Sequence, residues 1–210
     1  MSVQIELDLR SELGSIRDQG ARPTCLAYAV SAAHEHARAS LAYLSPEYLH
    51  YFAGIRAPSG GRSMKQVAKA LETAGQPEEA RYPFPVGGPP AGWSPPLGLE
   101  TFRWASKRMD GDAGQVSEAI RRARVPVLGM SVPESFFVPK APWVLSAGGT
   151  VRGLHAVAAV GLGRHRGNLV VLIRNSWGGD WGDFGHAWID DEFIAKHLRE
   201  VLVLTHEVTA

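Results

Sequence analysis

The chain has 210 residues, a formal net charge of +1 and 45% hydrophobic residues, which is the composition of a folded protein and excludes a disordered one. The small net charge predicts neither nucleic acid nor a membrane as a partner. No apolar run reaches the length of a membrane span, no secretory signal is visible, and the single cysteine, Cys25, cannot form an internal disulfide. These features predict a cytoplasmic location, unless a fused segment or a secretion system delivers the chain elsewhere.

The first half of the sequence favours helices. Capping residues and apolar spacing predict three of them: one over residues 25–38, one beginning at Ser45-Pro46, and one running from the capping box Ser63–Gln66 to a stop at Gly75. Thr24 is the expected N-cap of the first helix. Residues 83–96 hold six of the fourteen prolines, so this stretch is predicted to be a loop.

The second half favours strands. A short amphipathic helix is expected around residues 116–124, and apolar runs then predict strands over residues 125–132, 154–162, 168–175, 185–189 and 200–208. Residues 163–168 are typical of a hairpin turn. Helices followed by strands indicate an α+β fold with two layers or lobes, and a cleft between such lobes is a usual place for a site.

Cys25 lies at the predicted start of a helix, where the helix dipole favours the reactive thiolate. Taken alone, a free cysteine is more often a small buried hydrophobic residue. A nearby base would favour the reactive thiolate over the buried hydrophobic residue as the interpretation of Cys25. His34 and His36 lie two residues apart on the same predicted helix, so we expect them on the surface and not as a metal pair. His155 begins an apolar strand and can project into a cleft, although a lone histidine in a strand is more often structural.

Asn175 follows the apolar strand and precedes two tryptophans, Trp177 and Trp181, in a glycine-rich loop. An asparagine can hold an imidazole in one tautomer, as the third member of a set of nucleophile, base and orienting group. The tryptophans are then expected to shield that hydrogen bond from water. Without the other members, the loop would be interpreted as a turn packed with aromatic residues.

These segments occur in the order Gln, Cys, His, Asn and together resemble the papain-like cysteine peptidases. The matching stretches are "RDQGARPTCLA" around Gln19 and Cys25, "HAVAAVG" from His155, and "IRNSWGGDWGDFG" around Asn175. "SGGRS", residues 59–63, is similar to the glycine strip along which the family lays the substrate backbone, and "LDLR", residues 7–10, to the start of the mature enzymes.

The resemblance implies a single papain-like domain over residues 1–210. Its helical lobe would cover about residues 11–100 and its antiparallel sheet or barrel lobe about residues 101–210, with the N-terminal segment packing on the second lobe and the active-site cleft between the two lobes.

The resemblance also implies the roles of individual residues. Cys25 would be the nucleophile, His155 the base, Asn175 its orienting partner, Gln19 an oxyanion donor and Trp177 the shield. Residues implied to bind substrate are Gly60, Gly61, Arg62, Met64, Ala156 and Trp181. A protein or peptide would be the substrate, and neither a metal nor a cofactor is needed.

The chain also departs from the family pattern. Arg22 stands where the family commonly has a disulfide-bonded cysteine, and Leu26 stands where tryptophan is common. These departures predict a bacterial-type member without disulfides or a propeptide, or a catalytic domain of a longer protein. The arginine at the implied groove wall, Arg62, predicts a preference for Asp or Glu at the second residue upstream of the cleaved bond, unless its charge points to solvent.

Two other classes of function stay open from the sequence. The same residues can carry out other acyl transfers, as in an amidase, a deamidase or a transglutaminase, because the nucleophile does not dictate the acceptor. A non-catalytic binding module is the less favoured alternative, since all four functional positions are filled. A proteinaceous inhibitor and fused domains are possible partners that the sequence does not identify.

Overall fold

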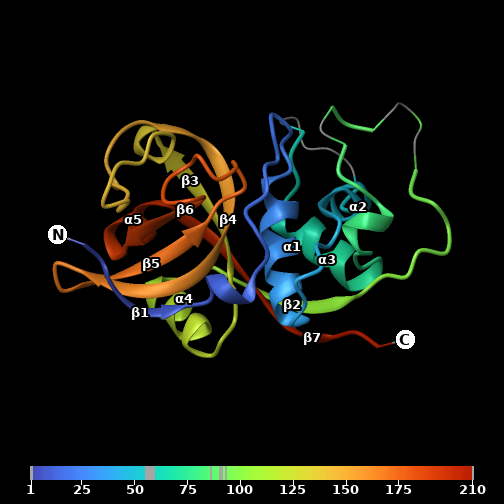
Figure 1. Ribbon diagram of the computed structural model, residues 1–210, viewed down its shortest axis with the longest axis horizontal. Coiled ribbons are helices and arrows are strands. Elements are labelled where there is room, and N and C mark those ends of the chain that lie inside the picture. The colour runs from blue at the N-terminus through green and yellow to red at the C-terminus, as the bar shows by residue number, and fades with distance from the viewer. Residues whose placement is uncertain (1, 55–59, 86, 90–91, 93, 210) are drawn as a thin grey trace.

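The computed structural model in Figure 1 describes residues 2–54, 60–85, 87–89, 92 and 94–209. The α-helices in these residues are α1 (Cys25–Ala37), α2 (Pro46–Phe52), α3 (Met64–Thr73), α4 (Ala113–Arg121) and α5 (Asp191–His197). The strands are β1 (Gln4–Asp8), β2 (Trp104–Met109), β3 (Val127–Pro133), β4 (Val151–His165), β5 (Asn168–Arg174), β6 (His186–Asp190) and β7 (Leu198–Glu207). Ser59 of the predicted glycine strip and part of the predicted 83–96 loop lie outside the described residues.

Capping side chains explain where two of the helices begin. The Ser45 hydroxyl accepts a hydrogen bond from the backbone N–H of Tyr48, and Pro46 follows it as the first helical residue. Ser63 and Gln66 form the predicted capping box at the start of α3. Thr24 occupies the N-cap position of α1, but its hydroxyl makes no capping hydrogen bond.

The strands form one antiparallel sheet in the order β2-β7-β3-β4-β5-β6, and β1 pairs with β4 off this path. The N-terminal part of β4 pairs with β3, whereas its C-terminal part pairs with both β5 and β1. Glycines permit this close approach of β1, since a Cβ at Gly161 would lie 2.7 Å from the Leu7 carbonyl oxygen and one at Gly163 2.8 Å from that of Gln4. The long strand β4 therefore connects the N-terminal segment to the position of His155.

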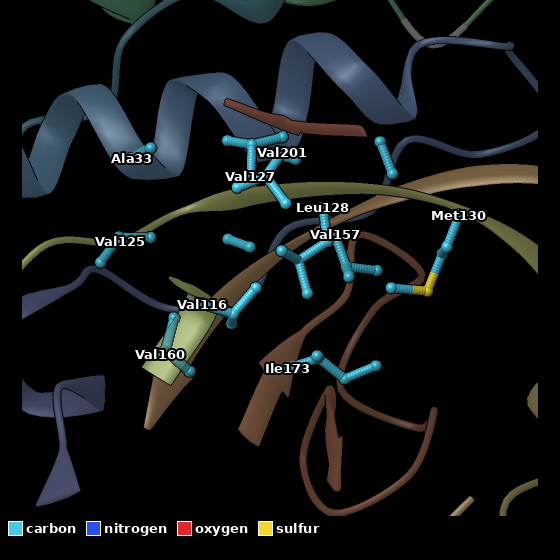
Figure 2. Close-up of a cluster of buried hydrophobic side chains, with 14 of the residues drawn as sticks. Ala33, Val116, Val125, Val127, Leu128, Met130, Val157, Val160, Ile173 and Val201 are labelled. Carbon is cyan, nitrogen blue, oxygen red and sulfur yellow. The ribbon is translucent and has the colours of Figure 1, made fainter. Parts of the chain in front are cut away.

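Helix α1 lies between the sheet and the helices α2 and α3 (Figure 1). Figure 1 shows α1, α2 and α3 together on one side of the molecule, with most of the strands on the other. Ten of the thirteen residues of α1 are buried, and Figure 2 shows its Ala33 next to side chains of β3 and β7. A helix packed on both sides has no wide solvent face.

The burial of α1 makes the prediction of two surface histidines wrong for His34. Its side chain is fully buried, at 0% exposure, and its Nδ1 hydrogen bonds to Gln76 Oε1 at 3.0 Å. His36 is half-buried and pairs with Glu12 at 3.0 Å. Apolar spacing within one helix does not reveal how many sides of that helix are covered.

Several element boundaries differ from the sequence prediction. The strands β1 and β2 and the helix α5 were not predicted. Helix α4 begins at Ala113 because the Asp112 side chain caps it by accepting from the Gln115 N–H, and it ends at Arg121 rather than Arg124. Strand β4 begins at Val151, so His155 lies inside the strand and not at its start.

Two kinds of feature are absent from the described residues. None of the helices there has the length and apolar character to cross a membrane. The same part of the chain holds no group of three or more His, Cys, Asp or Glu side chains placed to hold a metal ion.

Candidate active site

Cys25 is the first residue of α1, and its sulfur faces β4. Burial raises the pKa of the Cys25 thiol, while hydrogen bonds from the backbone N–H groups of Ala156, Leu26 and Cys25 itself act in the opposite direction. The contact with Ala156 is the informative one, because that residue follows His155 directly. The nucleophile and base predicted from distant parts of the sequence therefore lie on facing elements.

His155 and Asn175 are joined directly. The two residues come from β4 and from the end of β5, and His155 Nε2 lies 2.7 Å from Asn175 Oδ1. Because Asn175 Oδ1 is an acceptor, Nε2 carries the proton and Nδ1 is the acceptor nitrogen of the neutral ring. Burial lowers the pKa of His155 to about 4, although its hydrogen bond to Asn175 acts in the opposite direction.

Aromatic rings cover His155. The Trp177 ring lies 4.6 Å from the His155 ring between centroids, and Phe137 stacks on Trp177 at 5.3 Å with a 30° interplanar angle. Trp181 lies edge-on to Trp177, is buried, and donates its indole N–H to the Phe136 carbonyl at 2.8 Å. Trp177 thus lies against the His155 ring, and its shielding role stays a prediction. Trp181 supports it from behind, and contact between Trp181 and substrate stays a prediction.

Gln19 is held from two directions. Its Nε2 donates to the Arg22 carbonyl at 2.8 Å, and its Oε1 accepts from the Ser176 hydroxyl at 2.7 Å. The backbone N–H of Ser176 in turn donates to Asn175 Oδ1 at 2.8 Å. Ser176 therefore links the predicted oxyanion donor to the orienting asparagine. Ser176 stands within the stretch "IRNSWGGDWGDFG", but no role was predicted for it; its place between Asn175 and Trp177 was the available signal.

The described part of the glycine strip lies beside the turn that precedes Cys25. Gly60 has a φ of +76°, and a Cβ there would lie 3.2 Å from the Pro23 side chain, so a glycine is needed. The Arg62 guanidinium donates to the carbonyls of Gly60 and Gly61, both at 3.3 Å, and to that of His50 at 3.1 Å. Arg62 therefore braces the strip to which it belongs.

Met64 and Ala156, the two other residues predicted to bind substrate, are both buried. Ala156 pairs with Gly129 across β4 and β3, and the Met64 methyl lies 3.2 Å from where a Cβ on Gly129 would be. The three residues are therefore neighbours. Their contact with a substrate stays a prediction.

A comparison with protein-family models matched residues 3–196 of the chain to the papain family of cysteine proteases. Cathepsin K of Gallus gallus is 25% identical over 192 residues, which are 88% of this chain and 56% of that protein. The KDEL-tailed cysteine endopeptidase CEP2 of Arabidopsis thaliana is 50% identical over 38 residues, 18% of this chain and 10% of that protein. The chain thus spans little more than half the length of the first of these relatives, and far less of the second.

Solved structures agree on the fold. Xylellain, a cysteine protease from Xylella fastidiosa, superposes with a TM-score of 0.78 at 21% identity over 97% of this chain and 87% of its own. The clostridial cysteine protease Cwp84 superposes with a TM-score of 0.76 at 18% identity over 96% of this chain and 57% of its own. At such identities the likeness shows the fold alone, and it confirms the predicted α+β papain-like architecture.

Proposed function

This chain belongs to the papain family of cysteine proteases, and we propose that it is a cysteine peptidase that hydrolyses protein or peptide substrates through Cys25, His155 and Asn175. The hydrogen bond from His155 Nε2 to Asn175 Oδ1 carries the proposal, because it leaves Nδ1 as the base on the ring. The contact between the Cys25 sulfur and the N–H of Ala156 supports it. We extend the proposal to a reducing compartment, where the one thiol of the chain stays available.

In the proposed reaction, the Cys25 thiol gives its proton to His155 Nδ1 and the thiolate attacks the substrate carbonyl. Burial opposes each of these charges separately. Proton transfer within the pair creates both charges together, and their attraction offsets the lost hydration. His155 then gives the proton to the leaving amine, the C–N bond breaks, and water hydrolyses the thioester to release the acid and restore the thiol.

Gln19 would stabilise the oxygen of the tetrahedral intermediate. An amide nitrogen has two N–H groups, and one of those of Gln19 is already bonded to the Arg22 carbonyl. The second N–H, with the backbone N–H of Cys25, would donate to the developing negative charge. The rings of Trp177 and Phe137 would keep water from the His155–Asn175 hydrogen bond.

The proposal is tested with a mixed peptide library, read by mass spectrometry before and after incubation. We expect new peptide termini with the wild type and none with Cys25→Ala. A deamidation mass shift or cross-linked peptides without cleavage would instead indicate another acyl transfer. An unchanged library would indicate a binding module.

A second measurement tests the pairing of Cys25 with His155. A thiol-directed epoxide should label Cys25 at pH 5 much faster than it labels glutathione, because an ion pair keeps thiolate populated below the ordinary thiol pKa. The His155→Ala variant should lose this advantage. Labelling of the wild type at the rate of glutathione would contradict the ion pair.

A further inference from the structure

The side chain of Arg22 is fixed within the structure although the residue lies in a turn. Its guanidinium forms a two-pronged contact with Glu47 of α2, at 2.5 and 3.2 Å, and donates to the Pro85 carbonyl at 3.1 Å. Glu47 is 2% exposed and the Arg22 side chain 15%. A buried two-pronged pair of this kind has little freedom, because displacing either partner leaves a charge without compensation.

An aromatic contact holds the same guanidinium from another side. Its central carbon lies 4.6 Å from the centroid of the Phe84 ring, and Phe84 packs edge-on against Tyr28 of α1 at 5.1 Å. The Arg22 side chain is therefore in contact with α2 and with the segment at residues 84–85, which itself rests on α1. These contacts fix where the Arg22 backbone lies.

The backbone carbonyl of Arg22 is where this fixation reaches the active site. It accepts from Gln19 Nε2 at 2.8 Å and from the Thr24 N–H at 2.8 Å. The other end of the Gln19 amide is held by Ser176. Because an amide is planar, fixing one N–H and the oxygen also fixes the direction of the second N–H.

We propose that Arg22 is a positioning residue for the oxyanion site, and that it acts through Gln19. The ion pair with Glu47 holds the 19–24 turn, and the Arg22 carbonyl then aims the free N–H of Gln19 at the reacting oxygen. The inference rests on the proposed function, in which Gln19 is an oxyanion donor. An oxyanion donor is useful only at the right distance from the oxygen, and a misplacement of about 1 Å can lower turnover on the order of 10²-fold.

A double-mutant cycle tests the proposal. Gln19→Ala alone should lower kcat by on the order of 10²–10³-fold, as for removal of one oxyanion donor. Arg22→Ala alone should lower kcat by roughly 10- to 100-fold and change KM less than about twofold, because the turn loosens but the donor remains. In the Gln19→Ala background, Arg22→Ala should lower kcat by less than about threefold, since its target is gone.

The matched control is Arg10→Ala. Arg10 also forms a two-pronged contact with a carboxylate, that of Asp8, through its Nε to Oδ1 and a terminal nitrogen to Oδ2, but in the N-terminal segment. Its loss should leave kcat unchanged in both backgrounds. Equal losses on Arg22→Ala with and without Gln19 would overturn the proposal, as would full activity of Arg22→Ala. If Arg22→Ala does not fold, Arg22→Lys replaces it in the same cycle with the same criterion. Lysine keeps the positive charge but cannot form the two-pronged contact with Glu47.

A binding readout separates this proposal from the proposed function. A peptide aldehyde adds to the Cys25 thiol, and the resulting oxygen occupies the oxyanion site whether or not the enzyme cleaves peptides. Arg22→Ala should weaken aldehyde binding by roughly tenfold in the wild type and not in Gln19→Ala, while epoxide labelling of Cys25 stays unchanged. No cleavage by the wild type with this pattern would refute the peptidase and keep the positioning role. Cleavage by the wild type without this pattern would support the peptidase and refute the positioning role.

Discussion

The two sides of the active site are built with different chemistry. The helical side, residues 17–35 with their partners, is held by ion pairs: Arg17 contacts Glu35 at 2.9 Å and Glu79 at 3.0 Å, and Arg22 contacts Glu47. The sheet side consists of His155, the loop at residues 175–181 and the residues Phe136 and Phe137. It is held by rings and by hydrogen bonds between uncharged groups.

The difference follows from what each side must do. The helical side holds a turn and a helix start in place, and long charged side chains can connect backbone segments that are far apart in sequence. In the proposed mechanism, the sheet side carries His155, which gains and loses a proton. Among the described residues, two effects shift the pKa of His155: burial and the hydrogen bond to Asn175, and neither of them is a neighbouring charge. A carboxylate there would hold the proton on the ring.

Acidification should produce the largest effect, and it acts on His34 of the helical side and on His186 at the start of β6. Burial lowers the pKa of His34 and of His186 from 6.5 to about 4, and the nearby Arg38 and Arg174 act in the same direction. The folded state therefore binds fewer protons than the unfolded state, so stability is complete above pH 6.5 and falls as the pH drops towards 4. Each group should lower the free energy of unfolding by about 3 kcal/mol across that window.

Urea unfolding at pH 7 and pH 5 measures this loss. Asparagine keeps a donor near the position of Nδ1 but takes up no proton, so His34→Asn and His186→Asn should each lose less stability between the two pH values than the wild type. A wild type equally stable at pH 5 and pH 7 would contradict the prediction. Glu35 acts with the opposite sign, since burial raises its pKa and protonation there favours the folded state.

The next largest effect on stability should come from removing one carboxylate of the helical side, that of Glu35. Glu35 is buried, pairs with Arg17 and accepts from the Leu44 N–H at 2.9 Å. Glu35→Ala removes the acceptor for that buried N–H and leaves Arg17 paired with Glu79. We expect the free energy of unfolding to fall by about 3 kcal/mol, because a buried N–H loses its partner and a buried contact is broken.

The matched control is Glu118→Ala, which breaks the exposed pair between Glu118 of α4 and Arg122, the residue that follows α4. Its effect should be below about 0.5 kcal/mol. Equal urea midpoints for the two variants would show that burial does not strengthen the helical side.

The sequence could predict features that depend on neighbouring residues. Ser45 and Ser63 begin helices through contacts within four residues, and both starts are confirmed. β1 could not be found this way, because its five residues are mostly exposed and its partner is β4, about 150 residues away. The burial of His34 was hidden for a similar reason: it depends on elements that pack around α1 from elsewhere in the chain.

The same distinction applies to the active site. Cys25, His155, Asn175 and Gln19 could be proposed because their residue types and order resemble a family pattern. The links between them could not. Ser176 joins Gln19 to Asn175, and the Arg22 carbonyl holds Gln19, through contacts that exist only after folding. A sequence motif indicates which groups are present but not what holds them.

Removing the ring cover should lower both stability and turnover. Trp177 packs on His155 and Phe137, and each aromatic contact of this kind contributes about 0.5–1.5 kcal/mol to stability. Trp177→Ala should also lower kcat by roughly tenfold, because water then reaches the His155–Asn175 hydrogen bond, and Trp177→Phe should recover most of it. Phe184→Ala is the control from the same loop region, since that ring is exposed and should not matter. Equal kcat values for Trp177→Ala and the wild type would show that the cover has no catalytic role.

The smallest expected effect concerns substrate choice at Arg62, where the helical side meets the proposed groove. The guanidinium braces the glycine strip, so its charge is fixed beside the place where a substrate backbone would lie. We expect this charge to favour Asp or Glu over apolar residues at the second upstream position. An interaction between partly exposed charges is worth about 0.2–1 kcal/mol, so the preference in kcat/KM should be roughly 1.4- to 5-fold and should shrink in high salt.

Two substitutions separate the charge of Arg62 from its bracing role. Arg62→Gln keeps a donor for the strip carbonyls but removes the charge, whereas Arg62→Ala removes both. We compare kcat/KM on matched substrates that differ only at the second upstream position. Neither variant should favour the acidic substrate over the apolar one. Overall turnover should fall further with Arg62→Ala, because the strip also loses its brace. Lys65→Gln removes an exposed charge three residues further along the chain and should leave the ratio unchanged. An acidic-to-apolar ratio that is the same in Arg62→Gln as in the wild type would mean that Arg62 supports the strip without reading the substrate.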